Sequence, residues 1–305
     1  MLTVNRSACS ASMLDAEQTL VEPPVTCQIC AGQVFTHLFK KSGFDILKCS
    51  NCDIVFTNIP RGFDLLSIYD ESYFQGGQVD GYGNYLGTEA VLRREFKKSV
   101  TLLRELTGNR SGLKLLELGS AYGFFMDEAS QYFDCLGIEV STPAAEYSRQ
   151  RGHRVIGGML TEEALSQIGT VDIVALFDVV EHLADPVATF GLIDRCLNKD
   201  GVVMLTTGDI ESVYARLSGK SWRLMTPPQH TFFFSPRTLR SLFEKMNYKV
   251  EIVKRPWKVV PLSLAFYQLG SRLGLRFKVL EKLPLFVPVN LGDTMMIVAR
   301  KPSRS

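Results

Sequence analysis

The sequence predicts an α/β fold, a doubly wound and mostly parallel sheet with helices on both faces. Between residues 112 and 254, short apolar runs alternate with amphipathic stretches, and this alternation is typical of parallel strands joined by helices. The run Val171–Phe177 is almost continuously apolar, as expected for a strand whose two faces are both buried. A short segment with paired cysteines precedes this region, so we expect a small module in front of the α/β domain.

Local patterns place the individual strands and helices. Ser141 stands before Pro143, and Ser235 before Pro236; a hydroxyl residue followed by proline indicates the start of a helix. Upstream of the domain, apolar residues recur at spacings of three and four, which predicts an amphipathic helix with Leu92, Phe96, Val100, Leu103 and Leu106 on one face. The expected strands are 114–118, 134–140, 171–177, 201–207, 248–253 and 294–299.

Composition limits the class of protein. The chain has 305 residues, 46% of them hydrophobic and 22% charged, which is enough apolar material for a sizeable core. Its 34 basic and 32 acidic residues nearly balance, which argues against a surface built to bind nucleic acid. The first 20 residues hold no apolar signal segment, and no apolar run reaches the roughly 20 residues that span a bilayer. We therefore expect a soluble, cytoplasmic protein.

The segment over about 256–290 interrupts the alternation of strands and helices. It contains several prolines and mixes apolar residues with lysine and arginine. We interpret it as a helical cap insert over a substrate pocket. The same pattern could instead lie on a membrane surface, as a peripheral contact.

Four cysteines near the N-terminus indicate a metal site. Cys27 and Cys30 form one Cys-x-x-Cys pair, Cys49 and Cys52 form another, and 18 residues separate the pairs. Two such turns supply four thiolates, which is the ligand set of a structural zinc ion with no position left for a substrate. The alternative is a redox dithiol, which two equally spaced pairs do not favour. We predict a zinc ribbon over 25–60.

A glycine-containing turn marks a candidate ligand site in the α/β domain. The segment from Glu117 to Gly123 joins a strand to a helix through small residues, as required where the backbone approaches a ligand closely. Its glycine spacing is neither that of dinucleotide-binding proteins nor that of a P-loop. Glu139 ends the next strand, where a carboxylate can accept both hydroxyl groups of a ribose.

These features together resemble the class I S-adenosylmethionine-dependent methyltransferases. The resemblance rests on 117–123, Glu139, the segment 177–186, the segment 198–201 before a strand and the segment 230–236 before a helix. It extends to bacterial small-molecule methyltransferases, including those of ubiquinone and sugar biosynthesis, many of which carry an N-terminal zinc ribbon and a Tyr-rich connector. It implies a Rossmann-like, mostly parallel seven-stranded sheet. The expected regions are a flexible leader (1–24), the zinc ribbon (25–60), a Tyr-rich connector and helix (61–110) and the methyltransferase domain (111–305).

The resemblance also implies roles for individual residues toward S-adenosylmethionine. Glu117 would lie beneath the amino group of the cofactor, and Glu139 would hold the ribose hydroxyls. Met159 and Leu160 would flank the adenine, although an acidic residue often found there is absent. The remaining residues would line the methionine and ribose portion or close the pocket near the sulfonium: Gly119, Ala121, Gly123, Phe177 and Asp178. Ala121 stands where the family often has glycine.

Two histidines are candidates for the proton acceptor that a hydroxyl substrate requires. His182 follows a strand end and His230 lies in a later loop, and an imidazole suits proton transfer near neutral pH. The alternatives are a hydrogen-bonding role that shapes the loop for His182, and packing against Phe232–Phe234 for His230. Candidate substrate contacts are Tyr82, Tyr85, Trp222 and Arg223.

We therefore expect methyl transfer from S-adenosylmethionine to a small molecule, such as a sugar, nucleotide-sugar or glycan intermediate, most readily at oxygen. Two alternatives stay open. One is an RNA methyltransferase whose zinc ribbon binds nucleic acid, and the other is a binding or scaffold protein that has lost activity. The sequence does not indicate the acceptor atom or the oligomeric state.

Overall fold

The computed structural model describes residues 26–68, 86–261 and 286–303. The predicted leader over 1–24 lies outside these ranges, as do the connector tyrosines Tyr82 and Tyr85. Most of the predicted cap, 262–285, lies outside them as well. No helix in the described part of the chain has the length and apolar character needed to cross a membrane.

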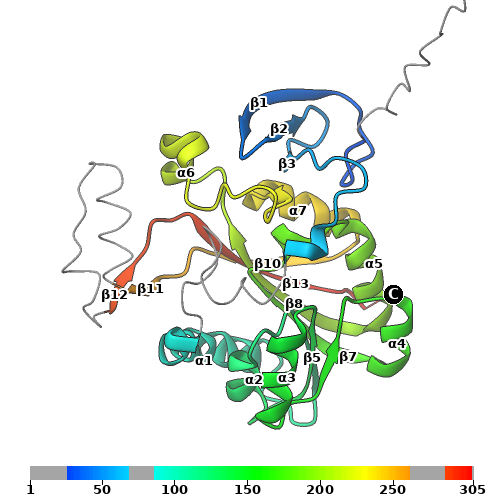
Figure 1. The fold of residues 1–305 in the computed structure, drawn as a ribbon. Helices are drawn as coiled ribbons and strands as arrows, with labels where there is room; N and C mark the ends of the chain where they lie inside the picture. Colours follow the sequence, from blue (N-terminus) through cyan, green and yellow to red (C-terminus); the bar gives the residue numbers. More distant parts are fainter. Residues whose placement is uncertain (1–25, 69–85, 262–285, 304–305) are drawn as a thin grey trace, which may run out of the picture.

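A seven-stranded sheet forms the centre of the molecule (Figure 1). Its order is β10-β13-β8-β7-β4-β5-β6, and only β13 runs antiparallel to its neighbours. The prediction of a mostly parallel, Rossmann-like seven-stranded sheet is therefore confirmed. The strands are β4 (Lys114–Leu118), β5 (Asp134–Glu139), β6 (Val155–Gly157), β7 (Val171–Phe177), β8 (Leu197–Gly208), β10 (Lys249–Lys254) and β13 (Thr294–Arg300).

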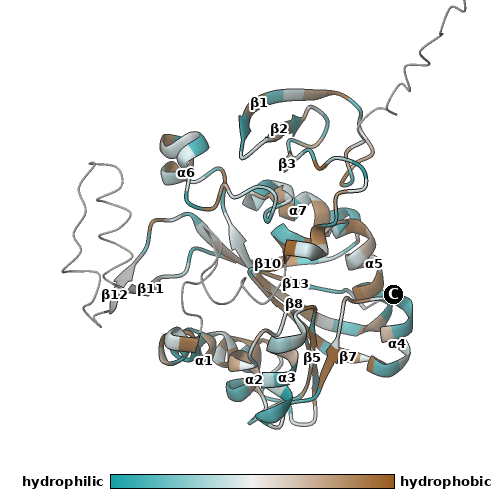
Figure 2. Cartoon of the chain, in the orientation of Figure 1, coloured by the Kyte–Doolittle hydropathy of each residue, from teal (hydrophilic) through white to brown (hydrophobic). Residues whose placement is uncertain are grey.

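Helices cover both faces of this sheet because its side chains alternate between two cores. On β4, Leu115 packs with α1 and α2, whereas Leu116 packs on the opposite face with α5 and α7. Figure 2 shows the apolar strands between helices whose outer surfaces are polar. The helices are α1 (Glu89–Leu106), α2 (Phe124–Ala129), α3 (Thr142–Gln150), α4 (Glu162–Ile168), α5 (Pro186–Cys196), α6 (Val213–Ser218) and α7 (Pro236–Lys245).

Side-chain caps start several of these helices. Ser235 accepts a hydrogen bond from the Thr238 amide and forms a capping box, as its position before proline suggests. Asp185 accepts from the Ala188 amide at the start of α5. The prediction for Ser141 holds only for its position. Ser141 precedes α3 as the N-cap residue, but its hydroxyl makes no cap hydrogen bond. Its amide instead donates to the side chain of Glu139.

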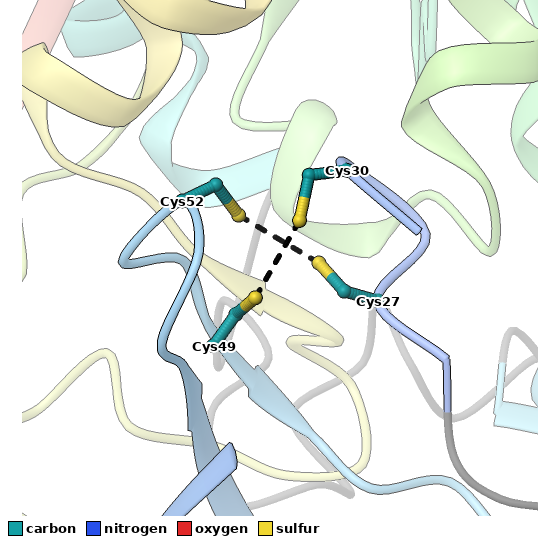
Figure 3. A group of neighbouring side chains, drawn as sticks. All are labelled: Cys27, Cys30, Cys49 and Cys52. Atoms are coloured by element: carbon teal, nitrogen blue, oxygen red, sulfur yellow. Dashed lines mark hydrogen bonds between the residues drawn. The ribbon is translucent and has the colours of Figure 1, made fainter. Parts of the chain in front are cut away.

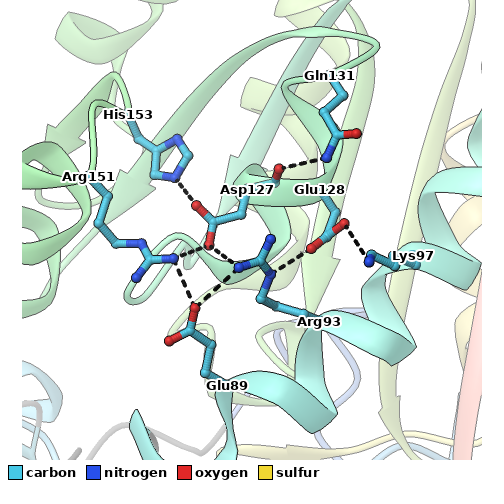
Figure 4. Close-up of polar contacts among 8 residues, drawn as sticks. All are labelled: Glu89, Arg93, Lys97, Asp127, Glu128, Gln131, Arg151 and His153. Atoms are coloured by element: carbon cyan, nitrogen blue, oxygen red, sulfur yellow. Dashed lines mark hydrogen bonds and ion pairs between the residues drawn. The ribbon is translucent and has the colours of Figure 1, made fainter.

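A network of charged side chains joins α1, α2 and the end of α3 (Figure 4). Asp127 on α2 accepts from His153 at 2.9 Å and from Arg151 at 2.5 Å. The neighbouring carboxylate of Glu128 accepts from Arg93 of α1 at 2.6 Å. Glu128 is buried, so this bond carries more weight than the exposed pairs around it. The network fixes the helical layer beneath the turn that follows β4.

The cysteine-containing module forms a second sheet, with order β1-β2-β3-β9. Its first three strands are β1 (Phe35–Lys41), β2 (Phe44–Cys49) and β3 (Val55–Thr57). The fourth strand, β9 (Phe232–Phe233), comes from the α/β domain and pairs with β3. Ile54 and Phe56 also belong to the same apolar core as the central sheet. The module is therefore built into the α/β domain.

The described ends of the predicted cap are extended. Strand β11 (Lys258–Pro261) pairs with β12 (Phe286–Val289) in antiparallel register, and the pair projects from the body of the molecule (Figure 1). Valines are frequent in both segments, and β-branched residues favour strands. The insert that we predicted as helical therefore begins and ends in extended backbone.

Candidate active site

A cavity of about 1230 Å³ lies at the carboxyl ends of the parallel strands. The chain continues from β4 to its neighbour β5 on one side, whereas the later strand β7 lies on the other side of β4. The cavity lies where the order of the strands reverses in this way. Ligands of open α/β sheets bind at such a reversal of strand order. Of the predicted cofactor residues, those lining the cavity are Glu117, Gly119, Ala121, Glu139, Met159, Leu160, Phe177 and Asp178.

The turn after β4 needs backbone that ordinary residues adopt reluctantly. Gly119 has φ +70°, and a Cβ atom there would lie 2.5 Å from Cγ2 of Val179. Ala121 has φ +44°, so this non-glycine residue occupies left-handed backbone at the cavity wall. The loop must therefore run close to the neighbouring strand end, and glycine is required at 119.

Gly123 has a different place. It precedes α2 with φ +81° and is not among the residues that line the cavity. A Cβ atom there would lie 2.5 Å from the hydroxyl of Ser148 and 2.6 Å from the ring of His153. The glycine thus allows α2 to pack against α3 and its end.

Glu139 is buried at the end of β5 and holds the turn in place. One carboxylate oxygen accepts the Ala121 amide and the other accepts the Ser141 amide, both at 2.8 Å. Burial raises the pKa of Glu139, and the two amides act in the opposite direction. Each carboxylate oxygen can accept a further hydrogen bond, and Glu139 lines the cavity, so its geometry suits a pair of hydroxyl donors.

Glu117 is buried beneath the same turn. Its Oε2 atom has no hydrogen-bond partner among the described residues. Burial, and then the nearby Glu139 carboxylate, raises the pKa of Glu117 well above its usual range. A buried carboxylate of this kind is stabilised by a cationic ligand. Glu117 is therefore suited to an ammonium group that enters the cavity.

The end of β7 forms the facing wall. Phe177 packs against Phe125 and Phe96, with ring centroids 4.6 and 5.2 Å apart. Asp178 follows with φ +55°, and Thr206 of β8 donates a hydrogen bond to its Oδ1 atom at 2.8 Å. A strained non-glycine residue held by a neighbouring strand at a cavity is a common feature of ligand-binding sites.

The structure brings His182 and His230 together. Their rings make an edge-to-face contact with centroids 4.6 Å apart, and His182 lines the cavity whereas His230 lies behind it. Each Nδ1 atom lies beside a carbonyl oxygen: Gln229 for His182 at 2.9 Å, and Leu224 for His230 at 2.7 Å. Carbonyl oxygens only accept, so each Nδ1 carries the hydrogen and Nε2 is the basic atom.

Burial also keeps both imidazoles neutral. It lowers the pKa of His182, and it lowers the pKa of His230 to about 3, with the His182 ring acting in the same direction. At neutral pH both rings are therefore proton acceptors and not cations.

The His230 loop is held from two sides. The amide of Thr231 donates to the carbonyl oxygen of Glu181 at 2.8 Å, which joins the loop to the segment of His182. From the cysteine module, the hydroxyl of Thr57 donates to the carbonyl oxygen of His230 at 2.7 Å. The Thr57 amide also donates to the Thr231 carbonyl at 2.8 Å. The module thus positions the loop that carries His230.

Trp222 and Arg223 lie elsewhere. Both donate to the buried carboxylate of Asp293, Trp222 at 3.0 Å and Arg223 through two bonds at 2.9 and 3.0 Å. Neither residue lines the cavity. These hydrogen bonds connect the loop after β8 to the start of β13. No local pattern in the sequence indicates Asp293 as the partner of the two side chains.

The cavity has a second group of residues that sequence reasoning did not select. Lys254 ends β10, Arg255 and Trp257 follow it, and all three line the cavity. Helix α1 contributes Leu92 and Phe96. Arg255 donates to Asp209, which is fully buried at the end of β8. Because β10 runs parallel to β8, its carboxyl end reaches the same edge of the sheet. The order of the strands cannot be read from the sequence, so these residues were not predicted to line the site.

The four cysteines converge in the module (Figure 3). The Sγ atoms of Cys27 and Cys52 are 3.7 Å apart, and those of Cys30 and Cys49 are 3.5 Å apart. All four lie within 4.8 Å of one another. A tetrahedral zinc ion with Zn–S bonds of about 2.3 Å requires sulfur atoms about 3.8 Å apart. The cluster is therefore suited to a metal ion.

Fold and cavity together define an S-adenosylmethionine-dependent methyltransferase, with an acidic residue at the ends of β4 and β5 and a close-packed glycine turn between them. The chain belongs to the family described as methyltransferase domain, whose model matches residues 91–253, just over half of the sequence. The match begins within α1 and ends within β10, so the four cysteines and strands β1 to β3 lie outside it.

The chain is also similar to several known proteins. The ubiquinone biosynthesis O-methyltransferase of Methylococcus capsulatus is 27% identical over 165 residues, which cover 51% of this chain and 67% of that protein. The crystal structure of magnesium protoporphyrin IX methyltransferase from Synechocystis, with bound SAH, has a TM-score of 0.51 at 12% identity and covers 78% of this chain and 98% of that one. A SAM-dependent methyltransferase from Thermotoga maritima has a TM-score of 0.49 at 18% identity, over 78% and 100% of the two chains. The Synechocystis structure shows the shared fold.

Proposed function

We propose that this enzyme transfers the methyl group of S-adenosylmethionine to a hydroxyl oxygen of a small molecule, such as a sugar, nucleotide-sugar or glycan intermediate. The observation that carries the proposal is the position of His182. Its neutral imidazole lines the same cavity as the cofactor residues, with Nε2 as the basic atom. A hydroxyl acceptor must lose its proton as the methyl group arrives, and a neutral buried imidazole can receive it.

The chain's own residues hold the cofactor in this proposal. Glu117 binds the ammonium group, since its buried carboxylate needs a cationic partner. Glu139 accepts the ribose hydroxyls while its two amide bonds keep it oriented. Met159 and Leu160 flank the adenine, and Phe177 and Asp178 close the cavity on the side of the methyl group. When bound, the cofactor supplies an electrophilic methyl group for in-line displacement.

The acceptor occupies the remaining part of the cavity. The α1 face and Trp257 provide apolar walls there, while Lys254 and Arg255 provide hydrogen-bond donors. Such a mixture suits a molecule with both a ring face and polar groups. The similarity to a ubiquinone biosynthesis O-methyltransferase supports oxygen as the acceptor atom.

The cysteine module binds a structural zinc ion in this proposal. The sulfur separations support a closed four-thiolate site, which leaves no coordination position for a substrate. Strand β3 of the module pairs with β9, and Thr57 holds the His230 loop, so the module acts within the chain itself. Elemental analysis of the purified protein should find at least one zinc ion per chain, and replacing Cys27 and Cys30 by serine should remove one.

Thermal unfolding with and without S-adenosylhomocysteine tests the cofactor assignment. A ligand at about one hundred times its dissociation constant adds roughly 2.7 kcal/mol, or about 5–10 °C for a domain of this size. We expect this shift in the wild type and in Glu163→Ala, a control on the exposed surface of α4, and its loss in Glu139→Ala. A wild type that does not shift at millimolar ligand would contradict the cofactor site. Mass spectrometry of a methylated sugar product then locates the methyl group, and methylation at nitrogen or carbon would contradict the acceptor atom.

A further inference from the structure

A group of three ligand-type side chains, one buried and two partly buried, lies at the cavity wall. One carboxylate oxygen of Glu181 and one ring nitrogen each of His182 and His230 all lie within 4.8 Å of one another. Glu181 and His182 come from the short helical turn Val180–His182 after β7, and His230 comes from the loop before β9. We propose that these residues form a divalent-cation site, distinct from the four-cysteine site.

The donor set suits a first-row transition metal. Two imidazoles and one carboxylate are a common set of protein ligands for zinc and for non-haem iron, and they leave coordination positions for water or a substrate oxygen. Glu181 is buried, and a buried carboxylate is stabilised when a cation binds it. The cluster thus supplies both the charge and the nitrogen ligands that such an ion needs.

The surroundings of the rings give independent support. Metal-binding histidines generally donate their second ring N–H to a carbonyl or carboxylate, which fixes the ring and its tautomer. Both histidines do so here, through Nδ1 to the carbonyl oxygens of Gln229 and Leu224. Both Nε2 atoms are therefore already in the form that binds a metal, and the rings are held in place before the ion arrives.

The loop that supplies His230 is also braced at its backbone. The Thr231 hydroxyl donates to the carbonyl oxygens of Glu181 and Leu183, at 2.9 and 2.8 Å. These bonds hold the two chain segments of the site together. A site assembled from remote segments binds a metal tightly only when such contacts fix its ligands.

Position gives the ion a part in the reaction. His182 lines the cavity, so a cation on its ring nitrogen lies at the wall where the acceptor binds. A divalent cation that binds the acceptor hydroxyl lowers its pKa, so the oxygen loses its proton to water before it attacks the methyl group. In the cation-bound enzyme, His182 holds the ion, and it accepts the proton itself only when no ion is present. The binding of a cation does not depend on the proposed function, but the catalytic role of that cation rests on the proposed function.

Cobalt(II) binding to the zinc-loaded full chain tests the site. With the cysteines occupied by zinc, added Co²⁺ on nitrogen and oxygen ligands gives weak visible bands without the strong near-ultraviolet bands of cobalt thiolates. We expect one equivalent of Co²⁺ in the wild type and in His37→Gln, a control for an exposed histidine on β1. Glu181→Gln and His230→Gln should each weaken binding by at least about tenfold.

Two results would overturn the site. One is the absence of cobalt binding at millimolar Co²⁺, and the other is binding that neither Glu181→Gln nor His230→Gln weakens. The thermal shift with S-adenosylhomocysteine, measured on each variant without added cobalt, shows whether the variant is folded and binds cofactor. A wild type that binds cobalt but not S-adenosylhomocysteine would retain the cation site and reject the proposed function.

Discussion

The two walls of the cavity are built in different ways. The cofactor wall comes from one continuous stretch, in which Glu117, the glycine turn and Glu139 lie within 23 positions of one another in the sequence. The histidine wall consists of His182 and His230 and of the residues that hold them. It is assembled from three distant segments, and one of its hydrogen bonds joins Thr57 to His230 across 173 positions. The first wall depends on local backbone geometry. The second depends on the packing of the cysteine module against the α/β domain.

Gly119→Ala should cause the largest effect and should act on the cofactor wall. The added methyl group meets Val179 at 2.5 Å, and left-handed backbone penalises alanine as well. Together these should cost about 2–4 kcal/mol in unfolding free energy and weaken S-adenosylhomocysteine binding. Urea unfolding and calorimetric binding measure the two effects.

Gly112→Ala is the matched control for that variant. Gly112 has φ +71°, almost the same as Gly119, but nothing lies within 4 Å of its added Cβ. It should lose only about 1 kcal/mol, the cost of left-handed backbone, with cofactor affinity unchanged. Equal effects in the two variants would show that the contact with Val179 is unimportant, and the cofactor wall would then not depend on close packing.

Thr57→Val should separate the two walls. Valine keeps the shape of threonine but removes the donor to the His230 carbonyl, which should cost about 1–2 kcal/mol in stability. Turnover should fall while S-adenosylhomocysteine affinity and zinc content stay unchanged, and Thr57→Ser should restore turnover. A parallel loss of cofactor affinity would mean that the two walls are not independent.

The pH dependence of stability should show the most gradual effect. The folded-state pKa of His230 is lowered to about 3, below its ordinary value of 6.5. Below pH 6.5 the unfolded chain therefore binds a proton that the folded chain does not, and stability falls as the pH is lowered, by up to about 1.4 kcal/mol per pH unit.

The comparison of wild type with His230→Gln isolates this contribution. Glu117 and Glu139, whose pKa values are raised, act in the opposite direction in both proteins and cancel in the difference. Urea unfolding between pH 7 and 5, without added divalent cation, measures it. A difference that does not change with pH would show that His230 is protonated in the folded protein.

The same contrast explains what the sequence could predict. The strand–turn–helix at Glu117–Gly123 and the strand that ends at Glu139 follow from residues close together in the chain, so both were located in advance. The clustering of the four cysteines could also be predicted, because each Cys-x-x-Cys pair forms one tight turn. The pairing of β3 with the two-residue strand β9 was not predicted, because nothing in either short segment specifies so remote a partner.

Trp222 and Arg223 illustrate the same limit. Their residue types suit substrate binding, but both side chains bind Asp293, about 70 positions further along the chain. Lys254 and Arg255 were overlooked for a related reason, since only the antiparallel insertion of β13 between β8 and β10 brings their strand end to the cavity. The residue type indicates which contacts a side chain can make, and the order of the strands determines whether that side chain reaches the cavity.

The pairing of β3 with β9 also has a consequence for how the protein is made. During synthesis the first three strands of the small sheet leave the ribosome long before Phe232 and Phe233 are translated. The N-terminal module must therefore wait with an unpaired edge until most of the chain has emerged. Contacts of such sequence separation form late and slow folding, so the histidine wall is among the last parts of the enzyme to be completed.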